Sequence, residues 1–404
     1  MSFTLIRNLR RTTLVGQQLR FESTRTNVTQ EDYLFRPPFA KWTKVIREAE
    51  KVVGYPTSFM NLRWLLSDEF ANMAMHLRKV VGSNHPVLQT AKSIIYNEHN
   101  NLQPWGLMIL LLSKALKSEP SMSQANGILE NQRIIAEITE MIRTGHYVHR
   151  GLLNIPLEER DKDTDTAMFG NKIAILIGDY LLVTANRMLA GMKNQDISYL
   201  ISTALRDISE GEFFGDRDKQ NMPLPGDPNT VKNINDEFQI CFDTLPLEVV
   251  NTLGSPVREW TLRTLFSGGS LFGRGCQGAV LLGGHGLEEQ ENAYLFGCHL
   301  CLAWHASSEL AKIMSDKESV YSLVSAPVLF ALNENPSLYS AIQDSKDDTS
   351  DLNLNKLKLD VLDTNAVGRT KLLYEVNLKK AFHYIEKFGD NNSVDTIKRL
   401  SATL

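Results

Sequence analysis

Helical periodicity runs through most of this 404-residue chain and limits the folds that it can adopt. Apolar residues recur at helical spacing from about Lys44 onwards, and the first such segment repeats at Val45, Ile46, Ala49 and Val52. No segment shows the sustained strict alternation of apolar and polar residues that marks a half-buried strand. The pattern therefore predicts an all-α protein.

Two polar segments interrupt the helical series, which is otherwise rich in strong helix formers. Residues 156–166 read as a charged loop, and residues 215–256, which hold several prolines and glycines, read as an irregular insert on the surface. We expect one large helical domain over residues 44–404. Its predicted helices are 58–80, 86–97, 104–117, 126–150, 167–191, 195–213, 257–282, 290–315, 318–332, 354–364 and 369–388.

The amino-terminal residues have a different composition from the rest of the chain. Residues 1–26 hold five arginines against one acid, Glu22, together with many hydroxyl residues and apolar residues on one helical face. This combination is typical of a mitochondrial transit peptide, and the alternative is a basic tail without structure. We expect a mitochondrial (matrix) protein in which residues 27–43, with Pro37 and Pro38, form a linker.

The composition narrows the classes of function. The net charge is −4, so nothing indicates a nucleic-acid partner. No apolar run approaches the ~20 residues that span a bilayer, so we expect no transmembrane segment. Four cysteines are too few for a disulfide scaffold and suit a reducing compartment.

Three short matches to ligand-binding motifs lack the context that those motifs need. Residues 273–278 fit G-x-G-x-x-G, but their flanks are helical, so we expect close helix packing rather than a dinucleotide site. Residues 298–301 form a C-x-x-C without the second pair that a zinc site needs, so we expect buried cysteines. Residues 161–172 begin like a calcium loop but lack its glycine and its final glutamate.

A fourth match is to a magnesium-binding signature. Residues 347–351 fit D-D-x-x-D, a pattern that holds magnesium diphosphate when its carboxylates share a helix face. Here the run lies in a Ser/Asn/Asp-rich stretch over residues 343–355 and reads as a solvated turn with a helix cap.

Residues 170–182, GNKIAILIGDYLL, resemble a characteristic helix of the trans-prenyl diphosphate synthases, with matches at Asn171, Lys172 and Asp179. The resemblance covers roughly residues 44–390 and implies a single large helix bundle of the isoprenoid-synthase type. In that family, aspartates from two facing helices hold the magnesium ions that neutralise a leaving diphosphate.

Both aspartate-rich motifs of that family are degenerate in this chain. At the first motif His149 keeps the family's histidine, but Arg150, Gly151 and Asn154 replace the aspartates. At the second motif the sequence is Ser308, Glu309 and, three residues later, Lys312.

The groups that grip diphosphate in the family are also altered. The resemblance places a basic loop near residues 99–106, where the basic residues are missing. Of two lysine-threonine pairs, the first corresponds to Arg263-Thr264 and the second has become Ser267-Gly268. Arginine can contact a diphosphate but cannot assemble a magnesium cluster.

These losses together predict a chain with no catalytic residues and no metal of its own. Degenerate motifs of this kind resemble those of the second subunit of long-chain (decaprenyl or solanesyl) synthases within the family. Residues 48–60 also resemble the start of that subunit. The resemblance implies a catalytic subunit 1 as partner, a heterotetramer, Mg²⁺ in the partner, and synthesis of the isoprenoid side chain of ubiquinone.

Two other functions stay open at this point. The chain could be an autonomous prenyltransferase with a rearranged metal site, built on Glu309 or on the aspartates of residues 347–351. It could also bind isoprenoids without chemistry. We expect His149 and Asp179 to be structural rather than catalytic.

Overall fold

The computed structural model describes residues 39–54, 104–116, 127–152, 162–219, 221–230, 252–315, 321–346 and 352–402. All named elements of these residues are helical, and an isolated antiparallel bridge joins Arg217 to Pro223. The predicted all-α class is therefore confirmed. The helices are α3 (Phe39–Val53), α7 (Trp105–Ala115), α8 (Glu130–His149), α9 (Lys162–Gly191), α10 (Gln195–Gly211), η2 (Pro228–Thr230), α11 (Pro256–Thr264), η3 (Leu265–Gly269), α12 (Ser270–Leu282), α13 (Leu287–Met314), α14 (Ala326–Glu334), α15 (Ser337–Asp344), α16 (Leu354–Leu362), α17 (Ala366–Glu386) and α18 (Asn392–Ala402).

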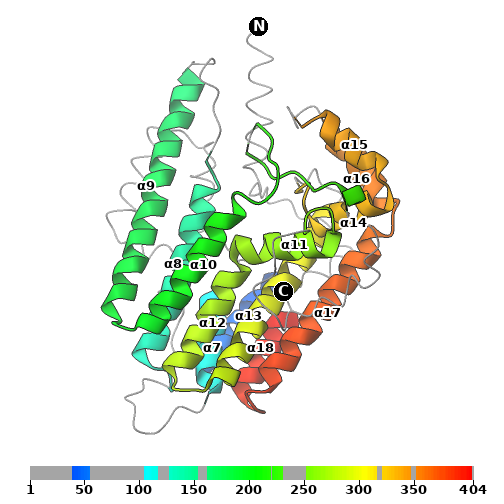
Figure 1. Ribbon diagram of the computed structural model, residues 1–404. Coiled ribbons are helices and arrows are strands. Elements are labelled where there is room, and N and C mark those ends of the chain that lie inside the picture. The colour runs from blue at the N-terminus through cyan, green and yellow to red at the C-terminus, as the bar shows by residue number, and fades with distance from the viewer. Residues whose placement is uncertain are drawn as a thin grey trace.

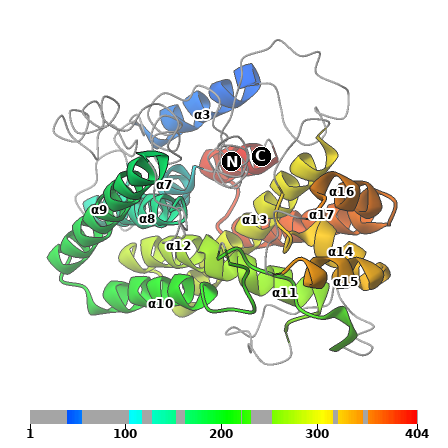
Figure 2. The same ribbon diagram turned by 90° about the horizontal axis from the view of Figure 1, so that it is seen from above.

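The helices form one bundle around α13. This helix packs against α12 on one side and α17 on the other, while α8 packs against α7, α9 and α12 (Figures 1 and 2). Helices α3 and α18 pack against each other and against α7. The short helices α14, α15 and α16 gather beside one end of α17 (Figure 1).

The contact between α12 and α13 depends on glycine. A Cβ atom on Gly297 would lie 2.8 Å from the Cα of Gly273, and one on Gly273 would lie 2.7 Å from the Cys298 sulfur. A Cβ on Gly278 would lie 2.3 Å from Ile135 of α8. The glycines of residues 273–278 therefore allow close helix packing, as predicted, and do not form a phosphate-binding loop.

Several predicted boundaries are wrong. Helix α3 begins at Phe39, inside the predicted linker, and α9 begins at Lys162, inside the predicted charged loop. The single helix predicted over 257–282 is broken by the π-helical η3, where Gly268 has φ 150°. Only part of the helix predicted over 318–332 forms, because α14 begins at Ala326.

Two α-helices, α15 and α18, were not predicted, and an asparagine precedes each of them. Asn391 accepts hydrogen bonds from the backbone of Ser393 and Val394 and so caps α18. Asn335 accepts from the backbone of Ser337, the first residue of α15. The predicted helices over 58–80 and 86–97, the segment 1–26 and the turn at 347–351 lie outside the described residues.

The described parts of the 215–256 insert are its two ends. Residues 215–219, 221–230 and 252–256 lie against α11, and a Cβ on Gly226 would lie 2.4 Å from the Gly254 nitrogen. The two ends of the insert therefore meet and form a packed stem.

Candidate functional site

His149, at the end of α8, packs onto α9. Its Nε2 lies 3.4 Å from Asp179 Oδ1 and 3.3 Å from the Ile175 carbonyl oxygen. A Cβ on Gly178 would lie 2.0 Å from the same Nε2. His149 and Asp179 thus link α8 to α9.

The remaining positions of the first motif present no acid. Arg150 is the exposed C-cap residue of α8, and its backbone nitrogen donates to the His146 carbonyl at 3.0 Å. Gly151 continues the turn by donating to the Val148 carbonyl. Asn154 lies outside the described residues.

Glu309, the acid at the second motif, bonds to groups of this chain. Its Oε2 accepts from the Trp260 indole nitrogen at 2.8 Å and from the Ala326 backbone nitrogen at 2.9 Å. Ala326 is the first residue of α14, where unpaired backbone N–H groups favour an anion. Burial nevertheless raises the pKa of Glu309 to about 7. Glu309 thus links α13, α11 and α14, while Ser308 and Lys312 lie half-buried on α13.

Cations dominate the space between the ends of α8 and α13. The pKa of His305 is lowered to about 3 by burial and by the charges of Lys312, Arg150 and Arg143. The pKa of His146 is lowered to about 4, again by burial first and then by Arg150 and His149. Burial is the larger cause of both shifts, and the nearby cations of α8 and α13 add to it.

The described residues do not suit magnesium. No group of three His, Cys, Asp or Glu side chains within them lies close enough to hold a metal ion. Magnesium requires oxygen ligands, and the side chains of Arg150 and Lys312 supply none. The motif positions as described do not fit the metal cluster of an active synthase.

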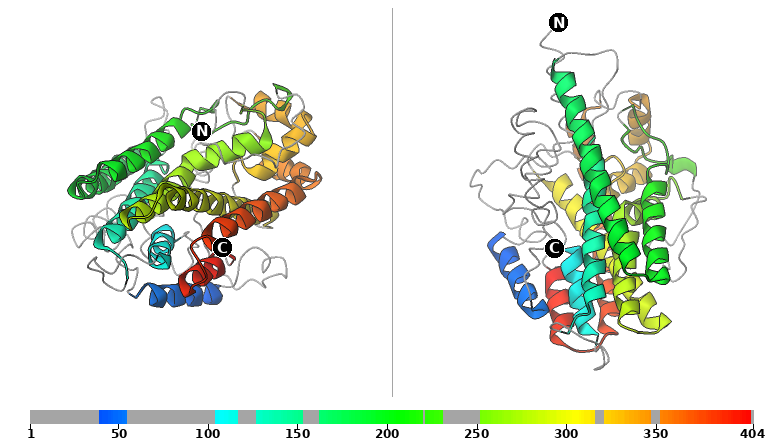
Figure 3. Two further views of the ribbon diagram at one scale, coloured as in Figure 1. Left: turned by 60° about the horizontal axis from the view of Figure 1, so that its bottom comes forward. Right: turned by 90° about the vertical axis from the view of Figure 1, so that its left-hand side faces the viewer.

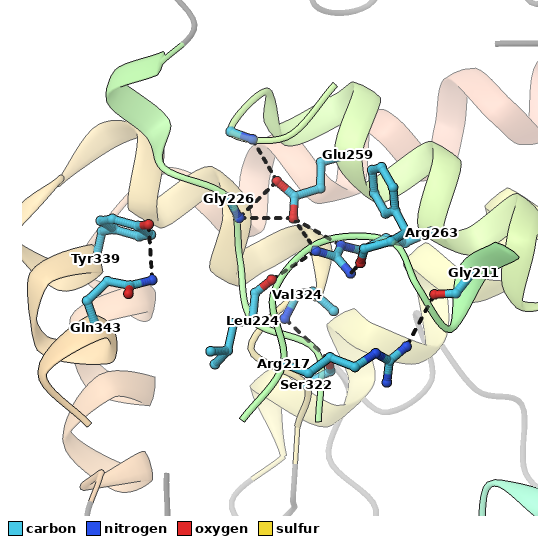
Figure 4. Close-up of polar contacts among 12 residues, drawn as sticks. Gly211, Arg217, Leu224, Gly226, Glu259, Arg263, Ser322, Val324, Tyr339 and Gln343 are labelled. Carbon is cyan, nitrogen blue, oxygen red and sulfur yellow. Dashed lines mark hydrogen bonds and ion pairs between the residues drawn. The ribbon is translucent and has the colours of Figure 1, made fainter. Parts of the chain in front are cut away.

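Arg263 stands, by the sequence resemblance, at the lysine of the first diphosphate-gripping pair. Its side chain forms an ion pair and hydrogen bonds within this chain. Its guanidinium bonds to Glu259 Oε1 at 2.8 Å and to the carbonyls of Phe214 and Leu224 (Figure 4). Glu259 also accepts from the backbone nitrogens of Gly226 and Gly254. This buried ion pair fastens the stem of the insert to α11.

The end of the altered basic loop holds an aromatic residue instead of a cation. Trp105 is buried at the start of α7, and the Arg143 guanidinium lies 4.2 Å from the centre of one of its rings. Glu140 accepts from the Gly106 backbone nitrogen at 2.9 Å and pairs with Arg143 at 3.5 Å. The sequence analysis missed this cluster, although aromatic and charged residues at successive turns of α8 and α7 are a signal for it.

The cysteines of α12 and α13 are core residues. Cys276, Cys298 and Cys301 are buried and free. Burial raises the pKa of each thiol, that of Cys298 to about 12, so none is poised as a thiolate ligand. The prediction of buried cysteines is confirmed.

Helix α9 has one face buried against α8 and one face exposed along the edge of the bundle (Figure 3). Lys172 is exposed and Asn171 half-buried beside this face. We define the α9 face by its large exposed apolar side chains, which are Met168, Phe169, Ile175, Leu176, Tyr180 and Val183.

Part of α9 has the composition of a membrane span, which the sequence analysis did not foresee. Met168–Gly191 is long enough to cross a bilayer, and an 18-residue stretch within it has a mean hydropathy of 1.5 and is 39% buried in the bundle. Its buried residues contact α8, so we interpret α9 as a bundle helix with an uncovered apolar side.

Comparison with known proteins places the chain in a family with this helical fold. Residues 103–225 match the family model described as polyprenyl synthetase. The human all trans-polyprenyl-diphosphate synthase PDSS2 is 36% identical over 300 residues, which are 72% of this chain and 68% of that protein. The chain belongs to the polyprenyl diphosphate synthase family. The mouse PDSS2 is 37% identical over 302 residues, with the same coverage. The predicted family is therefore confirmed.

A further relative and a solved structure extend the comparison. The probable mitochondrial hexaprenyl pyrophosphate synthase of Yarrowia lipolytica is 23% identical and covers 90% of this chain and 89% of its own length. The polyprenyl synthase of Caulobacter crescentus has a TM-score of 0.58 at 15% identity, covering 90% of this chain and 96% of that one. The latter match confirms the isoprenoid-synthase fold.

Proposed function

We propose that this chain is the non-catalytic subunit of a heteromeric trans-polyprenyl diphosphate synthase, and that a homologous catalytic subunit supplies the metal site. The observation that carries the proposal is that the Glu309 carboxylate is already occupied by hydrogen bonds within this chain. The carboxylate at the second motif accepts from Trp260 and Ala326 within the chain, and the first motif offers Arg150 and Gly151. Ionising an allylic diphosphate needs magnesium ions held by carboxylates, which these positions do not provide.

The α9 face supports association with a partner. Six large apolar side chains on one helix exceed the scattered exposure that is normal for a surface, and such patches commonly mark interfaces. The face is also self-complementary. In an antiparallel pair centred between Ile175 and Leu176, Lys172 of one helix would lie opposite the residue equivalent to Asp179 of the other. A partner helix with the same pattern therefore suits this face, as expected of a homologous subunit.

The finer parts of the proposal rest on the resemblance and on residues 1–26. We propose that the partner is the catalytic subunit 1, that the assembly is a heterotetramer with Mg²⁺ in the partner, and that the product forms the isoprenoid side chain of ubiquinone. The mitochondrial name of the Yarrowia relative and the arginine-rich segment 1–26 support the mitochondrial matrix as its location.

The test is turnover by the purified chain alone. With Mg²⁺, farnesyl diphosphate and isopentenyl diphosphate, we expect no elongated product. A triple variant, D347N/D348N/D351N, separates the proposal from an autonomous enzyme. Metal-dependent product from the wild-type chain that disappears in this variant would overturn the proposal and place the metal site at residues 347–351.

A further inference from the structure

Three aromatic side chains from three helices stack in the middle of the bundle. The ring centroids of Trp105 on α7 and Phe272 on α12 are 5.2 Å apart, and those of Phe272 and Trp304 on α13 are 5.6 Å apart. The interplanar angles are 19° and 21°, and each side chain is at most 2% exposed. We name these three residues the aromatic ladder.

The ladder is closed by tight contacts at the Trp105 end. The Arg143 guanidinium covers Trp105 and is itself only 6% exposed. On another side, a Cβ on Gly268 would lie 2.7 Å from the Trp105 ring. Because η3 brings its backbone against the indole at Gly268, the ladder has little room to shift.

The ladder lies on the amino-terminal side of both degenerate motifs along α8 and α13. Arg143 precedes Arg150 by two helical turns on α8, and Trp304 precedes Glu309 by between one and two turns on α13. An isoprenoid chain attached to a diphosphate at the motif positions would have to run into the space between α7, α8, α12 and α13. Trp105, Phe272, Trp304 and Arg143 occupy that space.

We infer that the interior formed by these four helices is a closed core, and that the partner holds the whole isoprenoid chain of substrate and product. A small-molecule site typically needs ~300–1,000 Å³, and between these helices the ladder residues instead pack against one another, against Arg143 and against Gly268. The inference rests on the proposed function and specifies it: this chain acts on the partner through its surface and does not lend a tunnel to the growing product. A closed core also argues against the alternative that this chain binds isoprenoids in its interior without chemistry.

A photolabelling experiment on the assembled complex tests the inference. The probe is a benzophenone-bearing farnesyl diphosphate analogue, and labelled peptides are assigned by mass spectrometry. We expect all labelling that unlabelled farnesyl diphosphate competes away to fall on the partner. Competed labelling of peptides from α7, α8, α12 or α13 would overturn the inference and leave the proposed function intact.

A second measurement needs no partner. Trp105 and Trp304 belong to the ladder and Trp260 lies beside Glu309, so in a variant with Trp42 and Trp64 replaced by phenylalanine a chain entering the core would change the tryptophan emission. Titration of the isolated chain with farnesyl diphosphate should leave the emission unchanged beyond the response to inorganic diphosphate. A saturable change that inorganic diphosphate does not produce would contradict the closed core. This result is independent of whether the complex forms.

Discussion

The carboxylate of Glu309 is held by donors from two other helices while burial raises its pKa to about 7. An acid whose pKa is raised in the folded state contributes stability below the unfolded value, and loses that contribution as the pH rises through the folded value. The ionised form of Glu309 therefore lowers the free energy of unfolding above pH 7. The carboxylate at the second motif is thus a titrating link between α13, α11 and α14.

Glu309→Gln should remove this pH dependence, because glutamine keeps an acceptor oxygen and cannot ionise. We predict that the free energy of unfolding of the variant relative to wild type increases between pH 5 and pH 8, by ~1–3 kcal/mol. Urea unfolding at several pH values checks this. A constant difference across that range would mean that Glu309 does not titrate there. The lowered pKa values of His146 and His305 act in the opposite direction and are common to both proteins.

Gly178 provides a steric test of the α8–α9 contact. Gly178→Ala should lower the free energy of unfolding by ~1–3 kcal/mol, because the new methyl group would collide with the His149 ring. The matched control is Gly191→Ala at the end of the same helix, where a Cβ meets nothing within 4 Å. Adding His149→Ala to Gly178→Ala should recover part of the loss in thermal or urea unfolding. Equal losses in both single variants would refute the contact.

At the scale of elements, the helical series and its likeness to a family were predictable, since periodicity and the GNK…GDY helix are local patterns. The break at Gly268 was not, because it follows from the long-range contact with Trp105. The role of Arg263 was also hidden, because Phe214, Leu224 and Glu259 converge on it only in the fold. A motif position identifies a residue type but not the partners that tertiary packing supplies.

The ion pair between Glu259 and Arg263 predicts a strong effect on the insert. Arg263→Met should lower the free energy of unfolding by ~3–5 kcal/mol, because it leaves the fully buried Glu259 without its cation. Arg206→Met, which breaks an exposed ion pair on α10, should cause no measurable loss. Thermal unfolding of the two variants checks this, and the melting temperature of Arg263→Met should be the lower one. Equal melting temperatures would contradict a structural role for Arg263.

The α9 face predicts where the partner binds. Leu176→Lys should leave the unfolding transition of the isolated chain unchanged and weaken capture of the catalytic subunit at least tenfold, because a charge would be buried at the interface. Leu359→Lys on α16 changes another exposed leucine, 63% exposed against 52% for Leu176, and serves as the control. Capture that is insensitive to Leu176→Lys but lost with Leu359→Lys would move the interface away from α9.

At the scale of the whole molecule, charged residues at and near the degenerate motifs and at the altered lysine-threonine pair bond to partners within the chain. Glu309 bonds to Trp260, Arg263 to Glu259 and Glu140 to Arg143, while the aromatic ladder fills the space below them. The family frame is retained, and among the described residues α9 exposes six large apolar side chains. A fold that keeps its helices, loses its metal ligands and exposes an apolar helix face is suited to act through another subunit.

The central claim is that this chain is inert alone and required by a catalytic partner. The most direct measurement compares product formation by the catalytic subunit alone, by this chain alone and by the co-purified complex, at equal catalytic-subunit concentration with Mg²⁺, farnesyl diphosphate and isopentenyl diphosphate. We predict long-chain product from the complex and none from this chain. Full turnover and full product length from the catalytic subunit without this chain would contradict the account.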